Sequence, residues 1–170
     1  MKNIYLPVLA ITLFAFTSCK KKDDTNNDAC GNKNFTASVS NGKSFESCNV
    51  ISSMSTPYLQ IHAQDNNGGT GDFQQIILQI PAQAFAAGTY TIATMDLQST
   101  TCTGSYSLGS ANNVQYTSDA SATGTLTVSA YDGTAKKISG TFSFTGKKSY
   151  PTAGTETITV TSGSFTDITW

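Results

Sequence analysis

The stretch "ISGTFSFTG", residues 138–146, alternates bulky apolar side chains with small polar ones. Successive side chains of a β-strand point to opposite faces of a sheet, so this period of two predicts a strand with one buried face. We expect Phe142 and Phe144 to point inward, because a shift by one residue would expose both rings. The side chains expected to point outward are those of Thr141, Ser143 and Thr145.

The same alternation recurs along the chain, in runs separated by turn signals such as "NGK" at 41–43 and "DNNGGTGD" at 65–72. No run of eleven residues carries a helical stripe, and "AQAFAAG" at 82–88 is long enough for one turn at most. Short strands at close spacing are typical of β-sandwiches and barrels. We therefore predict an all-β fold, an antiparallel β-sandwich of about nine or ten strands, with a closed β-barrel as the alternative. The alternating runs are "FTASVS" (35–40), "SFESCNVI" (44–51), "YLQIHAQ" (58–64), "FQQIILQI" (73–80), "GTLTVSAYDG" (124–133) and "GTETITVTSGSF" (154–165).

Glycine followed by a small hydroxyl residue precedes several of these runs, at Gly88, Gly124, Gly140, Gly154 and Gly163. Glycine adopts turn conformations easily, so we interpret each of these positions as a turn that leads into a strand. Residues 95–122 are rich in Ser, Thr and Asn, and their alternation is weak. "GSYSL" (104–108) and "NVQYT" (113–117) are the short strands expected there.

The N-terminus reads as an export signal. Met1-Lys2-Asn3 is followed by an apolar stretch from residue 4 to 16, which is typical of a signal peptide and too short for the roughly 20 residues of a spanning helix. "FTSC" at 16–19 resembles a bacterial lipobox, in which the cysteine is lipidated on sulfur and becomes the mature N-terminus. The sequence thus predicts a signal peptide at 1–18, a lipidated Cys19 with a flexible tether at 19–34, and a single folded domain at 35–170.

Two other interpretations of this segment stay open, an uncleaved membrane anchor and an ordinary secretory signal followed by an unmodified cysteine. Acyl chains such as palmitate on Cys19 would hold the protein at a membrane, since two or more chains give stable anchoring. The following "KKKDD" at 20–24 resembles the lysine-plus-acidic export tag of some Bacteroidota surface lipoproteins, or is a charged spacer. We expect an outer-membrane lipoprotein of the cell envelope, with display on the cell surface favoured.

Composition argues against nucleic acid as a partner. Charged residues are 12% of the chain, about half of the roughly 25% usual for soluble domains, and the net charge is −1. All basic residues are lysines, and three of them follow Cys19 directly, so no basic face is left to hold a phosphate backbone.

No catalytic or metal-binding pattern emerges from the sequence. His62 is the only histidine, and it lies on the polar face of its run beside Gln60 and Gln64, where a solvated sheet histidine is the expected role. Zinc sites need several His or Cys ligands, and a serine-hydrolase elbow G-x-S-x-G is absent. The two glutamates of the domain, Glu46 and Glu156, are far apart in sequence, and "DNNGGTGD" does not fit a calcium loop. We expect no catalytic residues, no metal and no cofactor.

Aromatic side chains are the candidates for a sugar-binding face. Tyrosines of a sandwich more often cap the edge of the core with the hydroxyl in water, and we expect that role here. The candidates are Tyr58, Tyr90, Tyr106, Tyr116, Tyr131, Tyr150 and Trp170.

Three cysteines remain after Cys19, an odd number for an oxidising compartment: Cys30, Cys48 and Cys102. We favour a disulfide between Cys48 and Cys102, because both lie within the folded domain and Cys30 lies in the tether. The pairings Cys30–Cys102 and Cys30–Cys48 remain alternatives.

Four motifs together resemble a family of Bacteroidota lipoproteins that carry a β-rich domain of unknown function. They are "FTASVSNGKSF" (35–45), "GTY" (88–90), "GTLTVSAYD" (124–132) and "ISGTFSFTGKKSYPTAGTETITVTSGSF" (138–165). The resemblance covers nearly the whole domain and implies a secreted, lipid-anchored β-domain without assigned catalytic residues. We therefore expect a non-catalytic binding or structural module whose partners are the membrane, through the lipid, and an unidentified protein or glycan. The alternative is an extracellular hydrolase acting on glycans or peptides.

Overall fold

The computed structural model of the chain describes residues 33–47, 49–65, 73–109 and 113–170. The expected signal peptide, Cys19 and most of the tether lie outside the described residues, as do Cys30 and Cys48. Within the described residues the chain forms eleven β-strands and no α-helix, with a 3₁₀ turn at Ala82–Ala84. The all-β prediction is confirmed, and the eleven strands slightly exceed the nine or ten expected.

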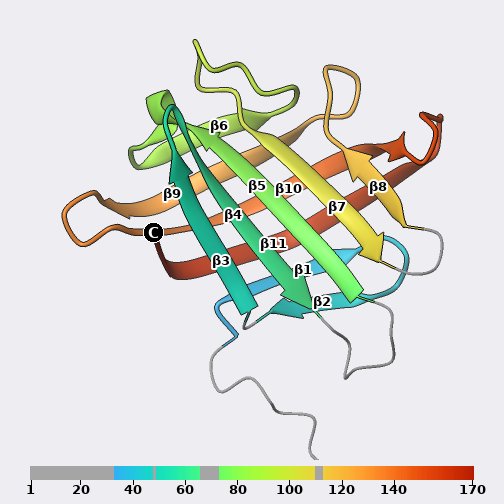
Figure 1. Ribbon diagram of the computed structural model, residues 1–170, viewed down its shortest axis with the longest axis horizontal. Helices are drawn as coiled ribbons and strands as arrows, with labels where there is room; N and C mark the ends of the chain where they lie inside the picture. Colours follow the sequence, from blue (N-terminus) through green and yellow to red (C-terminus); the bar gives the residue numbers. More distant parts are fainter. Residues whose placement is uncertain (1–32, 48, 66–72, 110–112) are drawn as a thin grey trace, which may run out of the picture.

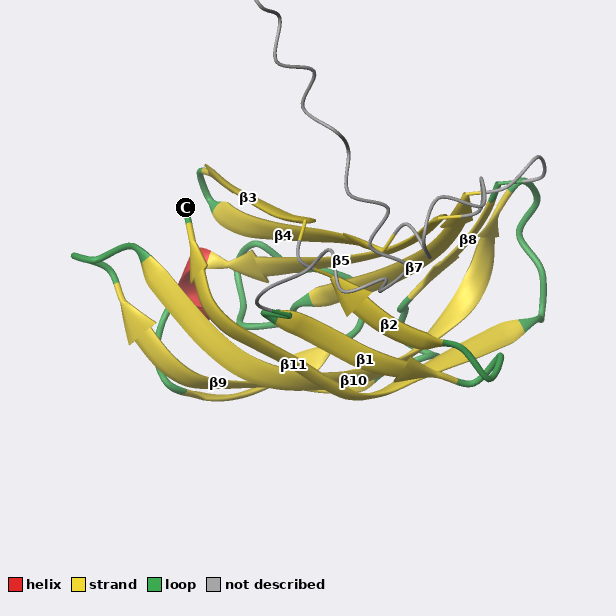
Figure 2. Ribbon diagram, turned by 90° about the horizontal axis from the view of Figure 1, so that it is seen from below, coloured by secondary structure: helices red, strands yellow, loops and turns green. Residues whose placement is uncertain are grey.

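The strands hydrogen-bond into one antiparallel sheet that folds over on itself into two layers (Figure 2). The first layer has the order β6-β9-β10-β11-β1-β2, and the second has the order β3-β4-β5-β7-β8. In Figure 1 the strands of the second layer lie in front and cross those of the first layer. The strands are β1 (Phe35–Val39), β2 (Ser44–Ser47), β3 (Asn49–Ser55), β4 (Tyr58–Asp65), β5 (Phe73–Pro81), β6 (Gly88–Ile92), β7 (Thr103–Gly109), β8 (Val114–Thr117), β9 (Gly124–Asp132), β10 (Lys137–Tyr150) and β11 (Thr157–Thr169).

The longest strand, β10, joins the two layers. Its residues 137–144 pair with β9 in the first layer, and its residues 147–150 pair with β8 in the second. The edge strands β2 and β3 also contact the opposite layer: the Ser52 hydroxyl of β3 donates to the Thr169 carbonyl oxygen of β11, and the Glu46 N–H of β2 donates to Asp65 Oδ2 of β4 at 3.2 Å. The sheet is thus nearly closed into a barrel, and it fits both the sandwich and the barrel predicted from sequence.

The register predicted for "ISGTFSFTG" is confirmed. Phe142 and Phe144 are buried, whereas Thr141 is exposed and Ser143 and Thr145 are half-buried. The rings of the first layer pack together, and the centroid of Phe142 lies 5.1 Å from that of Phe35. The second layer faces them with aliphatic side chains, namely Leu59, Ile61, Ala63, Ile76, Leu78 and Ile80.

The interpretation of every Gly-Thr or Gly-Ser pair as a turn was partly wrong. Gly88 and Gly124 do begin strands β6 and β9, but Gly140 and Gly163 lie inside β10 and β11. A Cβ at Gly163 would come within 2.6 Å of the Phe142 ring, which lies over this position. The glycine is needed there because a phenyl ring occupies the space that a side chain would fill.

The run "SFESCNVI" was expected to form a single return strand, and the structure divides it between the two layers. Residues 44–47 form β2, which pairs with β1, and residues 49–55 form β3, which pairs with β4. The buried Ser47 lies at this change of layer: its hydroxyl donates to the Gln64 carbonyl at 2.6 Å and accepts the N–H of Asn49 at 3.2 Å. These bonds connect the Ser47 hydroxyl to the backbone of the first residue pair of the β3–β4 ladder.

Candidate functional site

His62 lies on the outer face of β4, as the alternation predicted. Its cross-strand neighbours are Ile51 on β3 and Ile77 on β5. The Nε2 atom is buried and has no hydrogen-bond partner among the described residues. A general base needs an orienting partner within hydrogen-bond reach, and two isoleucines do not supply one.

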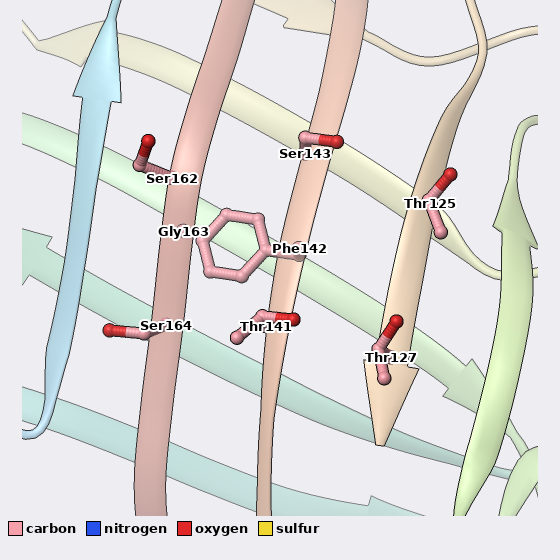
Figure 3. A pocket seen from close by; sticks show the side chains of 8 residues that line it. All are labelled: Thr125, Thr127, Thr141, Phe142, Ser143, Ser162, Gly163 and Ser164. Carbon is pink, nitrogen blue, oxygen red and sulfur yellow. The ribbon is translucent and has the colours of Figure 1, made fainter. Parts of the chain in front are cut away.

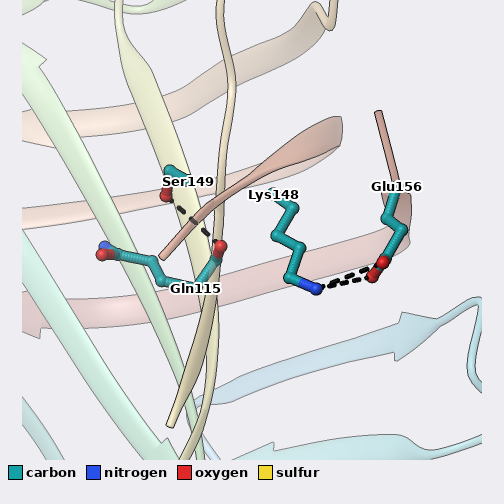
Figure 4. Close-up of polar contacts among 4 residues, drawn as sticks. All are labelled: Gln115, Lys148, Ser149 and Glu156. Carbon is teal, nitrogen blue, oxygen red and sulfur yellow. Dashed lines mark hydrogen bonds and ion pairs between the residues drawn. The ribbon is translucent and has the colours of Figure 1, made fainter. Parts of the chain in front are cut away.

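The two domain glutamates are engaged with lysines. Glu46 on β2 forms an ion pair with Lys33, and Glu156 accepts two hydrogen bonds from Lys148 Nζ, at 3.0 and 3.1 Å (Figure 4). No group of three or more His, Cys, Asp or Glu side chains able to hold a metal ion occurs in the part of the chain that the structure describes. The expectations of no metal and no cofactor stay predictions.

Cys102 is a buried, free thiol, so the preferred disulfide with Cys48 is not formed at its Cys102 end. Its Sγ donates to the Thr100 carbonyl at 3.6 Å, and burial raises the pKa of the thiol to about 12. The backbone of Cys102 pairs with the end of β6, at Ile92, so the residue lies within the core between the layers. Cys30 and Cys48 lie outside the described residues, and a bond between those two stays a prediction.

The outer face of the first layer carries two rows of hydroxyl groups. One cross-strand row runs in register through Thr89, Thr127, Thr141, Ser164 and Thr36, on five neighbouring strands. Some of these groups bond to each other, since Thr36 Oγ1 lies 2.8 Å from Ser164 Oγ. Thr125, Ser143 and Ser162 lie in the parallel row, and Figure 3 shows these hydroxyls around the point where the Phe142 ring lies beside Gly163. The depression over this point has a volume of about 380 Å³ and no charged lining residue.

The outer face of the second layer carries a different row, which we call the amide row. It crosses six neighbouring strands, from β3 to β10, with one residue in register on each strand. Sequence reasoning missed it, because its members come from six separate runs and only strand pairing aligns them. The amide row consists of Asn49, Gln64, Gln75, Ser107, Gln115 and Tyr150.

A depression of about 250 Å³ lies at the Tyr150 end of the amide row. The side chains of Gln75, Ser107 and Gln115 line it, together with two aromatic rings, Phe73 and Tyr150. The ring of Phe73 lies over Gly109, where a Cβ would meet it at 2.0 Å. This arrangement presents two apolar rings beside uncharged donors and acceptors, which is the chemistry of a binding surface for a neutral polar ligand.

A third depression, of about 520 Å³, lies where β8 meets the end of β10. Lys147, Lys148 and Asp119 line it, and the Lys148 ammonium is already paired with Glu156. Hydrogen bonds from Ser121 hold the pKa of the Asp119 carboxyl below its usual value. Charges of both signs balance here, so the depression has no net preference for an anion or a cation.

Tyr90, Tyr116, Tyr131 and Trp170 are partly buried against the core, as expected. Tyr106 is an exception, because it is fully buried and its hydroxyl bonds to Gln74 and Asn41 in place of water. Tyr150 differs, because 53% of it is exposed and its ring lines the depression of the amide row. The sequence carried no signal for this, since the residue follows the lysine pair that ends the alternation of β10.

The sequence profile described as "Domain of unknown function (DUF6252)" matches residues 32–169, and the chain therefore belongs to this family. A domain of unknown function spanning the β-rich part of the chain was expected from the resemblance, and that part of the expectation is confirmed. Comparison with curated proteins found no match. Comparison with solved structures found none either.

No helix of the described residues has the length and hydrophobicity needed to cross a membrane. The expected signal peptide lies outside those residues. The Bacteroidota origin, the lipid anchor and the outer-membrane location therefore stay predictions.

Proposed function

We propose that the chain is a lipid-anchored protein of the cell envelope whose domain is a non-catalytic binding module. The observation that carries the proposal is the character of the two outer faces. Both present uncharged hydroxyl or amide groups in register across five or six strands, and the single histidine lies between two isoleucines. Such faces offer many weak, neutral contacts and no group positioned to move a proton.

The anchor is supported by "FTSC" at 16–19 and by the short apolar stretch before it. Mass spectrometry of the mature protein is expected to find an acylated N-terminal Cys19. A Cys19→Ala variant is expected to leave the membrane fraction, and Cys30→Ala, a matched change in the tether, is expected to stay with it. A Cys19→Ala protein that still sediments with membranes would contradict the anchor.

The extracellular hydrolase is the competing proposal, and His62 is the residue that separates the two. We expect His62→Gln to leave the fold, the stability and any cellular phenotype nearly unchanged, because the imidazole has no orienting carboxylate beside it. A matched change on the same face is Gln60→Ala. Loss of a measurable hydrolytic activity in His62→Gln, with the Tm unchanged, would replace the binding module by the hydrolase.

A further inference from the structure

The spacing of side chains along the amide row matches the repeat length of an extended polymeric ligand. Neighbouring strands of a sheet lie about 4.8 Å apart, so the row offers one hydrogen-bonding side chain at each step of that length. This step is close to the length of one sugar unit in an extended polysaccharide. The six members of the row, from Asn49 to Tyr150, therefore span a ligand of several units.

The side chains near the Tyr150 end are available to a ligand. The amides of Gln75 and Gln115 form no hydrogen bond with other described residues, and both side chains are half-buried on the outer face. In Figure 4 the Gln115 side-chain amide extends away from the other residues drawn, and the bond from the Ser149 hydroxyl, at 3.3 Å, goes to the Gln115 backbone oxygen. A carboxamide supplies both donors and an acceptor, which matches the vicinal hydroxyls of a sugar.

The rings supply the apolar part of the site. Tyr150 is 53% exposed, so most of its ring surface is open to a ligand, and Phe73 also lines the depression. The C–H faces of a pyranose ring are apolar, and an aromatic ring stacked on them removes apolar surface of both partners from water. The depression of about 250 Å³ is just below the usual range of small-ligand pockets and suits a single sugar unit.

We propose that the amide row binds an extended chain of neutral sugar units, with one unit stacked between Phe73 and Tyr150. This inference rests on the proposed function and names its ligand class. The lining of the depression holds no Asp, Glu, Lys or Arg, so an acidic glycan or a charged peptide finds no partner there. A neutral peptide is disfavoured because its backbone would need a free strand edge to pair with, whereas the depression is lined from β5, β7 and β8, and each of these strands is paired on both sides.

The test is a titration of the full-length lipidated protein, held in a detergent without a sugar head group. The ligands are hexasaccharides of β-1,4-glucose, β-1,4-mannose, α-1,4-glucose and N-acetylglucosamine, read by calorimetry. We expect saturable binding of at least one of them. Tyr150→Ala is expected to weaken it about tenfold, which corresponds to about 1.4 kcal/mol, and Gln75→Ala about threefold. Tyr150→Phe is expected to bind like the wild type, because stacking needs the ring and not the hydroxyl.

Thr141→Ala is the matched control, since it removes an exposed side chain from the outer face of the other layer. Absence of saturable binding to every hexasaccharide up to about 10 mM would overturn the inference. Binding that Thr141→Ala weakens and Tyr150→Ala does not would also overturn it, and would leave the proposed binding module intact on the hydroxyl face.

A serine- and glycine-rich neutral peptide that displaces the bound sugar at lower concentration would assign the row to peptides. Cleavage of a hexasaccharide during the titration would instead contradict the proposed function itself.

Discussion

The two layers of the sheet bury apolar side chains on their inner faces and differ in the side chains that they use. The first layer places all five buried phenylalanine rings among aliphatic side chains on its inner face, and the second covers its own with leucine, isoleucine and alanine beside Tyr106. Outside, the first layer carries rows of hydroxyls and the second the amide row, which ends in an exposed ring. The inner faces are interchangeable in kind, because burial rewards any apolar group that fits, but the outer faces differ in what they can bind.

The layers meet where a ring of one lies on a glycine of the other. A Cβ at Gly104, on β7 of the second layer, would come within 2.8 Å of the Phe144 ring of the first. Because Gly104 has no side chain, the Phe144 ring of the first layer can lie directly against the backbone of β7 in the second layer. Close packing of this kind makes the cost of removing a ring high, because the cavity cannot collapse easily.

The largest expected loss of stability comes from removing a buried side chain at this contact between the layers. Phe144→Ala is expected to lower the free energy of unfolding by about 3–5 kcal/mol, and Leu78→Ala in the second layer by about 2–5 kcal/mol. Both residues are at most 2% exposed. Urea unfolding of the two variants is the measurement, and an effect under about 1 kcal/mol for either would show that its layer is not part of one common core.

The second-largest expected loss of stability comes from breaking a buried hydrogen-bonded group, Gln74–Tyr106–Asn41, that links the two layers. The Tyr106 hydroxyl on β7 donates to Gln74 Oε1 at 2.7 Å and accepts from Asn41 Nδ2, in the β1–β2 turn, at 3.2 Å. Tyr106→Phe leaves the fully buried Gln74 oxygen without this donor, so we expect a loss of about 1–3 kcal/mol in urea unfolding. Tyr116→Phe, on the neighbouring strand, is the control and is expected to lose less. Equal losses would mean that the bridge does not hold the layers together.

The buried thiol predicts a smaller effect that depends on pH. Burial raises the pKa of Cys102 from 9.0 to about 12, so between these values the unfolded chain loses the proton while the folded chain keeps it. The contribution is therefore complete below pH 9 and is lost as pH rises toward 12, by at most about 1.4 kcal/mol per pH unit. Unfolding free energies measured between about pH 8 and pH 11 are expected to fall less steeply in Cys102→Ala than in the wild type. Identical slopes would show that the thiol is not protected in the folded state.

The smallest expected change in the free energy of unfolding comes from Ser143, which is next to Phe144 on β10 and points to the outer face. Ser143→Ala is expected to change the free energy of unfolding by about 0.5 kcal/mol or less, because the hydroxyl makes no buried contact. The measurement is the same urea titration as for Phe144→Ala. A loss comparable to that of Phe144→Ala would mean that the facing of the strand is reversed.

Local alternation was enough to predict most of the strands, their facing and the turn at "NGK". Period two is a local property, and the apolar side of each run had to be buried wherever the strand lay. It did not reveal that "SFESCNVI" changes layer after Ser47, or that Gly140 and Gly163 are covered by rings inside strands. Those outcomes depend on contacts between residues far apart in the chain, which a periodic pattern does not encode.

By itself the sequence determined an all-β domain with a phenylalanine-rich core, a lone histidine on an outer face and an N-terminus typical of an exported lipoprotein. The tertiary structure alone decided which strands are neighbours, that Cys102 is a buried free thiol, and that Gln75, Ser107, Gln115 and Tyr150 form one row. The physical reason is that the facing of a side chain follows from its own strand. The neighbour that it meets across the sheet is set by pairing between distant segments, where apolar burial and backbone hydrogen bonds of the whole sheet are satisfied together.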